Sequence, residues 1–230
     1  MPQAQSVRNP PTASYLTKMK KVVKMATRTT RGKVTLGLTG APAQAVLYLS
    51  KEDVERLLDA IPPVATRDAL LFDLIYHYGL RREEATLIRK DHVGDRIWIT
   101  RVKRGESREY PVFARTRRLL WSYLATVTSD SNPYLFPSPQ TAGAAVSVSL
   151  IYQLFRSYAA TAGIPQNRHH PHVLRHSIAV HLMNAGWDLA DVQKWLGHAS
   201  IASTLIYAKV SNTRLDKKFR ALRSTEVAAL

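Results

Sequence analysis

The 230-residue sequence contains no cysteine. Disulfide bonds, thiol catalysis and cysteine-ligated zinc sites are therefore excluded. The sequence also has no apolar run of about 18 residues, so no membrane-spanning helix is predicted, and its first residues lack the apolar core of a secretory signal. Hydrophobic residues make up 45% of the chain, which is enough to build a packed core in one or two domains.

Acidic residues are absent from positions 1–50 and sparse elsewhere. The chain has 33 Lys and Arg against 17 Asp and Glu, a formal net charge of +16. Such an excess favours a polyanionic partner, because each cation placed on a phosphate releases a counterion. It argues against an acidic metabolic enzyme, although a ribosome-associated or membrane-surface protein would also fit. Half of the excess lies in the first 50 residues, on Arg8, Lys18, Lys20, Lys21, Lys24, Arg28, Arg31 and Lys33.

Apolar periodicity and helix-end signals predict an α+β fold that is mostly helical, with one small antiparallel hairpin. Ser50 and Asp53 have the spacing of a capping box, which opens a helix that runs to Ala60. Strands are expected at 96–102 and 108–113, joined by a turn that contains glycine. Further helices are expected at 16–25, 66–78, from 82 onward, and at 115–126, 149–162, 173–185, 189–196, 201–208 and 212–222.

Side chains suited to chemistry concentrate in four places. Singly, each has an ordinary explanation: an arginine beside glutamates is commonly a surface ion pair, a hairpin lysine is commonly solvated, and a tyrosine in an apolar stretch is commonly in the core. Their order along the chain is more specific. The four places are Gly79-Leu80-Arg81-Arg82-Glu83-Glu84, Lys103, His172-Val173-Leu174-Arg175-His176, and Leu196-Gly197-His198 followed nine residues later by Tyr207.

In this order the motifs resemble the tyrosine recombinase (phage integrase) family, over residues 49–210. The segment Tyr134-Leu135-Phe136-Pro137 resembles a short segment of the same family. The resemblance implies the fold of the family's catalytic domain and a site-specific DNA recombinase. Such an enzyme integrates, excises or inverts a DNA segment through a 3′-phosphotyrosyl intermediate. It also implies six catalytic residues, namely the nucleophile Tyr207 with Arg81, Lys103, His172, Arg175 and His198.

The chemistry of a phosphodiester makes matching demands on these residue types. Two arginines can clamp the non-bridging oxygens with bidentate hydrogen bonds, which lysine cannot imitate. A tyrosine, with a reference pKa of about 10, needs a proton acceptor, and His172 is the expected one. Lys103 on a mobile hairpin is expected to protonate the leaving 5′ oxygen, and His198 to hold a phosphate oxygen. Glu84 is expected to brace Arg81 or to cap its helix.

No metal ion or other cofactor is expected, because the two arginines supply the neutralising charge. The histidines at 169, 170, 172 and 176 form a cluster in the sequence, but no carboxylate lies among them. A metal site is therefore not predicted there.

Three segments are expected: a basic N-terminal arm and linker at 1–48 without a full core-binding domain, a catalytic domain at 49–210, and a basic C-terminal helix or tail at 211–230, which is a candidate for exchange between protomers. The expected partners are double-stranded DNA, a homotetramer on two DNA sites, and an accessory DNA-bending or directionality factor, in the cytoplasm at a bacterial, phage or archaeal nucleoid. No membrane partner is expected. The candidate DNA contacts are Lys18, Lys20, Lys21, Lys24, Arg28, Arg31, Lys33, Arg82 and Arg104.

Two other functions use the same residues. A type IB topoisomerase-like enzyme would share the chemistry, although the chain length and the short spacing from His198 to Tyr207 favour a recombinase. A non-catalytic DNA-binding regulator would not need competent residues at all six positions. The sequence specifies neither the DNA target nor the direction of recombination.

Overall fold

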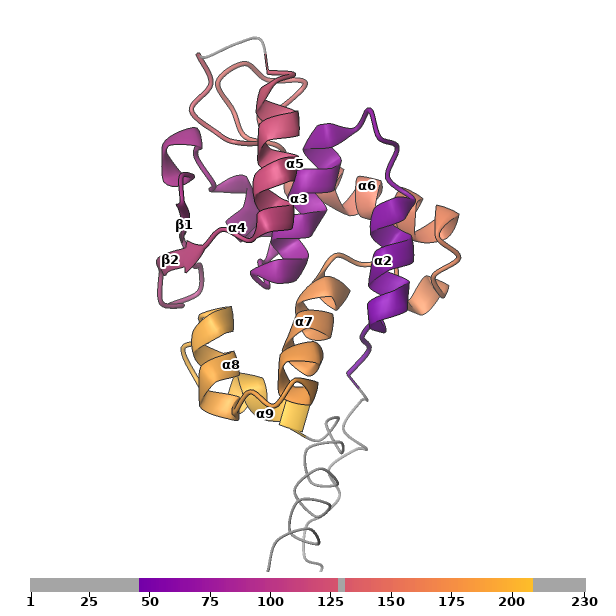
Figure 1. Ribbon diagram of the computed structural model, residues 1–230, viewed down its shortest axis with the longest axis vertical. Helices are drawn as coiled ribbons and strands as arrows, with labels where there is room; N and C mark the ends of the chain where they lie inside the picture. The colour runs from indigo at the N-terminus through magenta and orange to yellow at the C-terminus, as the bar shows by residue number, and fades with distance from the viewer. Residues whose placement is uncertain (1–45, 128–130, 209–230) are drawn as a thin grey trace, which may run out of the picture. The chain divides into compact units, whose positions relative to one another are not determined.

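The computed structural model describes residues 46–127 and 131–208 (Figure 1). Every element predicted within these ranges is found, and no predicted end differs from the observed one by more than three residues. The helices predicted at 16–25 and 212–222 lie outside the described residues. None of the helices among the described residues has both the length and the apolar character needed to cross a membrane.

Helices α2 to α6 build the larger part of the core. The helices are α2 (Lys51–Asp59), α3 (Thr66–His77), α4 (Arg82–Thr86), α5 (Ala114–Leu124) and α6 (Val148–Thr161). The predicted capping box of α2 is confirmed, since the side chains of Ser50 and Asp53 each accept a hydrogen bond from the other's backbone N–H. Helix α3 is buried among α2, α5 and α7 (Figure 1), which explains why its apolar residues surround the helix.

A two-stranded antiparallel sheet is formed by β1 (Arg96–Ile99) and β2 (Arg108–Pro111). Ile97 lies opposite Tyr110, and both are buried, so one face of the hairpin packs on the core. Both strands are shorter than predicted. After Ile99 the chain leaves the ladder, and the side chain of Arg101 turns inward.

Helix α7 (His172–Asn184) joins the two parts of the core. Its first turns contribute Val173 and Leu174 to the cluster built by α2 to α6, whereas Ile178 and Met183 belong to a second cluster with α8 (Leu189–Leu196) and α9 (Ala202–Ala208). Figure 1 shows α8 and α9 beside α7, in yellow-orange. Two 3₁₀ turns, at Lys90–His92 and Gln166–Arg168, complete the described elements.

The segment resembling a family motif, residues 134–137, is part of this core. Leu135 and Phe136 are buried. The backbone N–H of Leu135 donates to the carbonyl of Ile88, and Phe136 accepts from Val146. This short stretch therefore connects the end of α4 to the start of α6, and its role is packing.

Candidate active site

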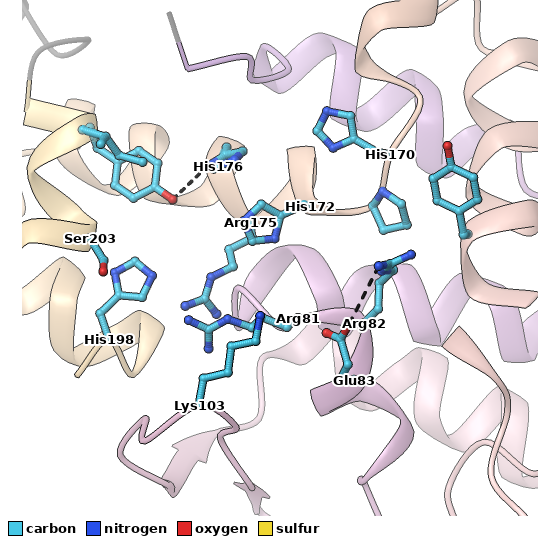
Figure 2. Close-up of a pocket in the computed structure, with 14 residues that line it drawn as sticks. Arg81, Arg82, Glu83, Lys103, His170, His172, Arg175, His176, His198 and Ser203 are labelled. Atoms are coloured by element: carbon cyan, nitrogen blue, oxygen red, sulfur yellow. Dashed lines mark hydrogen bonds and ion pairs between the residues drawn. The ribbon is translucent and has the colours of Figure 1, made fainter. Parts of the chain in front are cut away.

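All six predicted catalytic residues line one pocket, which has a volume of about 570 Å³. They come from four separate places in the chain, as the motif order implied. Figure 2 shows the side chains of Arg81, Lys103 and Arg175 converging from the start of α4, the hairpin and α7. A strongly cationic pocket of this kind suits an anionic ligand such as a phosphodiester.

Glu84 fixes Arg81 at the start of α4. Its carboxylate accepts a hydrogen bond from the backbone N–H of Arg81 at 3.0 Å and one from Nη1 of the same residue at 2.6 Å. The prediction that Glu84 braces Arg81 or caps its helix is confirmed, because it does both. Glu84 is fully buried, and burial alone would raise its pKa. The positive charges of Arg101 and Arg175 outweigh that effect and lower the pKa below its ordinary value.

Arg175 is also fully buried and is held by backbone carbonyls. Nη1 donates to the carbonyl of Gly79, and Nη2 donates to that of Leu196 at 3.0 Å. Glu84 Oε2 lies 3.6 Å from Nη1. Among the described residues, Nε has no hydrogen-bond partner. Burial lowers the pKa of Arg175 to about 9, so the guanidinium remains charged at neutral pH.

The hydroxyl of Tyr207, on α9, lies 2.9 Å from Nδ1 of His176 and forms a hydrogen bond with it, drawn as a dashed line in Figure 2. Tyr207 is 1% exposed, and this burial raises its pKa to about 12 against the opposing effect of Arg175. Burial, together with the charges of His170 and Arg175, lowers the pKa of His176 to about 4. Both partners are thus neutral at pH 7.

His172 begins α7 and is exposed in the pocket. Its ring centroid is 4.5 Å from that of His176, with the two rings edge to face. Although the side chain opens on the pocket, the surrounding protein removes part of the hydration of the ring. This desolvation, followed by the charges of His176 and Arg175, lowers the pKa of His172 to about 3, so the ring is neutral at pH 7.

Among the described residues, the hydrogen-bond partner of the Tyr207 hydroxyl is His176. His172, the expected proton acceptor, faces the pocket one helical turn earlier. The i, i+4 spacing of the two histidines on one helix face was the sequence signal for His176.

His198 lies in the turn between α8 and α9. Gly197 before it has φ +63° and ends α8 in the left-handed conformation that favours glycine. Nδ1 of His198 pairs with Oγ1 of Thr204 at 2.8 Å, and the imidazole ring lies nearly parallel to that of Tyr207, with the ring centroids 6.5 Å apart. Burial, then the charge of Arg175, lowers the pKa of His198 to about 3, so the ring is neutral at pH 7.

Two of the predicted DNA contacts, Arg82 and Arg104, lie among the described residues, and their role stays a prediction. Arg82 lines the pocket, with its guanidinium carbon 5.8 Å from the centroid of the Tyr152 ring. Arg104 is exposed in the hairpin turn beside Lys103, with φ +61°. The remaining candidates, Lys18, Lys20, Lys21, Lys24, Arg28, Arg31 and Lys33, lie outside the described residues. Within the described ranges, no three His, Asp or Glu side chains are grouped as metal ligands.

Arg101 was missed from the sequence, where it looks like one more cation at the base of a hairpin. Its side chain has no exposed surface, and its Nη1 donates to Glu84 Oε2 at 2.8 Å. Glu84 therefore joins three arginines, two in the pocket and one behind it. No local pattern signals this burial, because two of its other partners, the carbonyls of Tyr78 and Trp195, come from distant segments.

Comparison with known proteins finds tyrosine recombinases among the relatives of this chain. The tyrosine recombinase XerA of Thermococcus onnurineus is 33% identical over 181 residues, which cover 77% of this chain and 63% of that protein. The tyrosine recombinase XerC of Erythrobacter litoralis is 36% identical over 176 residues, covering 73% and 56% respectively. The chain therefore spans less than two thirds of the length of these relatives.

Solved structures agree with the fold. A crystal structure of XerA recombinase matches with a TM-score of 0.66 and 29% identity, covering 79% of this chain and 67% of that one. XerH recombinase bound to its difH substrate matches with a TM-score of 0.60 and 27% identity, covering 70% and 50%. The mostly helical domain with a small hairpin is thus the tyrosine recombinase catalytic fold. The sequence model of the phage integrase family matches residues 48–214, and the chain belongs to that family.

Proposed function

We propose that this protein is a site-specific DNA recombinase that cuts and rejoins DNA through a 3′-phosphotyrosyl intermediate. The observation that carries the proposal is the convergence of two arginines, a lysine, two histidines and a tyrosine in one pocket. The relatives are tyrosine recombinases by name, and the XerH structure is that of a site-specific recombinase bound to its difH substrate, which supports DNA as the substrate here.

In the proposed cleavage step, the Tyr207 oxygen attacks the phosphorus and the bond to the 5′ oxygen breaks. Arg81 and Arg175 hold the non-bridging oxygens, whose negative charge grows during attack. The phenolic proton passes to His172, and the leaving 5′ oxygen takes a proton from Lys103. His198 donates a hydrogen bond to a phosphate oxygen. In this assignment His176 holds the Tyr207 hydroxyl before attack, in keeping with their hydrogen bond of 2.9 Å.

The products of this step are a phosphotyrosine and a free 5′-hydroxyl. The phosphotyrosyl ester replaces one phosphodiester bond with a similar one, so a 5′-hydroxyl can rejoin it without ATP. Rejoining runs the same proton transfers in reverse. The proposal further includes exchange between two DNA sites by a homotetramer, with an accessory DNA-bending or directionality factor. The segments at 1–48 and 211–230 would then serve as a DNA-binding arm and as a contact between protomers.

Covalent capture tests the proposal without knowledge of the target. The full chain is incubated with a pool of nicked suicide duplexes whose central sequences are random, and the adducts are isolated on a denaturing gel and sequenced. We expect wild type to form an adduct enriched in one site, and Tyr207→Phe to form none. Absence of a wild-type adduct, or an adduct that survives Tyr207→Phe, would falsify the assignment.

The same site separates the alternative functions. A topoisomerase-like enzyme would relax supercoiled plasmids that lack the captured site as readily as plasmids that carry it. A non-catalytic regulator would bind the duplex and leave the strands intact. Relaxation or strand exchange confined to plasmids with the captured site is the result expected for a recombinase.

A further inference from the structure

Arg101 is an arginine with no exposed side-chain surface that lies outside the lining of the pocket. Burying a guanidinium is costly unless its donors are paired. The interactions of Arg101 with its partners must therefore offset this desolvation cost, and the identity of those partners indicates the role of the residue.

The guanidinium connects four segments. Nη1 donates to Glu84 Oε2 at 2.8 Å, and Nη2 lies 2.9 Å from each of three acceptors. These acceptors are the carbonyl of Tyr78 at the end of α3, the hydroxyl of Tyr110 on β2 and the carbonyl of Trp195 in the last turn of α8. Tyr110 in turn donates to the same Trp195 carbonyl at 2.8 Å. The side chain of Arg101 thus links the hairpin to the end of α3, to α4 and to the end of α8.

The hairpin turn packs tightly on the turn that precedes His198. A Cβ atom added at Gly105 would lie 2.6 Å from the carbonyl oxygen of Gly197, and one added at Gly197 would lie 2.8 Å from Cγ of Arg101. Contacts this close require glycine at both positions. The two turns and the stem of Arg101 therefore form one packed layer.

This layer supports Lys103 in an uncommon backbone conformation. Lys103 and Arg104 have φ of +55° and +61°, and the N–H of Gly105 donates to the carbonyl of Val102 at 3.1 Å. Positive φ at both central residues is a feature of a type I′ turn, which normally uses Asn or Gly. Such a conformation persists only where its surroundings impose it. Here the backbone N–H groups of Arg101 and the residue after it are held, by Ser107 Oγ at 2.9 Å and by Glu84 Oε1 at 3.4 Å.

We propose that Arg101 is a positioning residue, which places the ammonium group of Lys103 at the leaving oxygen by locking the hairpin turn onto α4 and the Gly197 turn. The inference rests on the function proposed above. Because its side chain is fully buried outside the pocket lining, Arg101 has no surface with which to contact DNA or the reacting atoms, and in this proposal it acts through Lys103. The hairpin, expected from the sequence to be mobile, is anchored at its base.

The chemistry of the leaving group separates this role from a general effect on the fold. An alkoxide is strongly basic and needs the proton from Lys103, whereas a thiol has a reference pKa of about 8.5 and leaves as the thiolate without one. In a substrate with sulfur in place of the bridging 5′ oxygen, the phosphorus–sulfur bond breaks and no proton is transferred to the leaving group. Loss of a correctly placed Lys103 should therefore matter only for the oxygen substrate.

The experiment measures the single-turnover rate of adduct formation by the full chain. The substrates are two suicide duplexes that carry the site identified by covalent capture, one with oxygen and one with sulfur at the bridging 5′ position. We expect Lys103→Ala to lose about 10²- to 10⁴-fold on oxygen, and Arg101→Gln about 10²-fold. On the sulfur substrate both variants should recover the wild-type rate. Arg96→Gln, which removes an exposed ion pair of the same hairpin with Glu109, is the matched control and should behave as wild type on both.

Gly105→Ala provides a second variant in case Arg101→Gln does not fold. Its added methyl group would lie 2.6 Å from the Gly197 carbonyl oxygen and 2.8 Å from Cβ of Arg101, so the turn must move away, whereas the charged groups of Arg101 and Glu84 are both kept. We expect the same pattern, a loss on oxygen and recovery on sulfur. An equal loss on both substrates by a folded variant, or no loss on oxygen, would overturn the proposal. Absence of a wild-type adduct on both substrates would instead reject the recombinase function itself.

Discussion

The Tyr207 hydroxyl forms its hydrogen bond with His176, 2.9 Å from Nδ1, and both groups are buried enough to favour their neutral forms. The pKa of about 12 for the phenol and about 4 for the imidazole are far apart, so proton transfer between them is strongly unfavourable in this arrangement. The pair therefore orients the nucleophile and keeps it protonated. The pKa of His172 is lowered as well, to about 3, so the pKa alone does not separate the two histidines. His172 is the candidate base because it is the one that matches the family motif and is the more exposed of the two in the pocket, where the negative charge of a bound phosphodiester would raise its pKa.

Substitution of the two histidines separates orientation from proton transfer. Asparagine has an acceptor oxygen near the position of Nδ1 but cannot take a proton at neutral pH. We expect His176→Asn to keep most of the adduct-forming rate, and His176→Leu to lose up to about tenfold, the value of one hydrogen bond. His172→Asn should lose about 10²- to 10⁴-fold, as for a general base. The measurement is single-turnover cleavage of a suicide duplex. If His176→Asn loses as much as His172→Asn, then His176 is the base.

The elements of the fold could be predicted from the sequence because their ends have local causes. Helix α8 begins after Asp188, whose side chain accepts from the N–H of Asp191, and ends at Gly197. These signals are visible in the sequence, and the predicted range of 189–196 is confirmed. The strands were predicted too long because alternation of apolar residues does not reveal where a chain leaves its ladder.

Only those residues of the site that belong to the family motifs could be predicted from the sequence. Their order identified six catalytic candidates, and all six line the pocket. Arg101 was not identified, because Glu84 and Trp195, its partners, lie 17 and 94 residues away and nothing in the local pattern marks a buried cation. The hydrogen bond of His176 depends in the same way on how α9 packs on α7, which is a property of the tertiary structure.

Glu84→Gln should destabilise the protein and impair cleavage together. The substitution removes the negative charge shared by Arg81, Arg101 and Arg175, all within 3.6 Å of the carboxylate oxygens. Breaking a buried ion pair in this way costs about 3–5 kcal/mol of unfolding free energy. Chemical denaturation at pH 7 measures this cost. Glu83→Gln, on the exposed side of the same helix, is the control and should change the unfolding free energy little. Equal stability of the two variants would contradict a central role for Glu84.

The protein should lose stability in acid before its carboxylates titrate. The pKa of His176 and His198 are lowered in the folded protein to about 4 and about 3, against about 6.5 when unfolded. Below pH 6.5 the unfolded chain therefore binds protons that the folded chain does not, and the unfolding free energy falls as the pH is lowered toward 4. Urea denaturation between pH 7 and pH 4.5 measures the slope. His176→Asn should make it shallower, and an unchanged slope would show that His176 contributes nothing to it.

The basic segment at residues 1–44 is expected to bind DNA through electrostatic attraction to the phosphates alone. The deletion that tests this should end at residue 44, because the residues that follow belong to the folded core. Val46 and Tyr48 pack on the second core cluster, and the backbone N–H of Leu49 donates to Ser177 Oγ at 2.8 Å. Deleting residues 1–44 removes all eight cations, whereas deleting 1–14 removes only Arg8. The slope of log Kobs against log salt changes by about 0.9 for each phosphate that the protein no longer neutralises. We therefore expect the longer deletion to weaken binding and flatten the slope by several units, and the shorter one by at most about one unit. Fluorescence anisotropy titrations with the captured duplex from low to high salt measure both. Equal slopes for the longer deletion and wild type would remove this segment from the DNA interface.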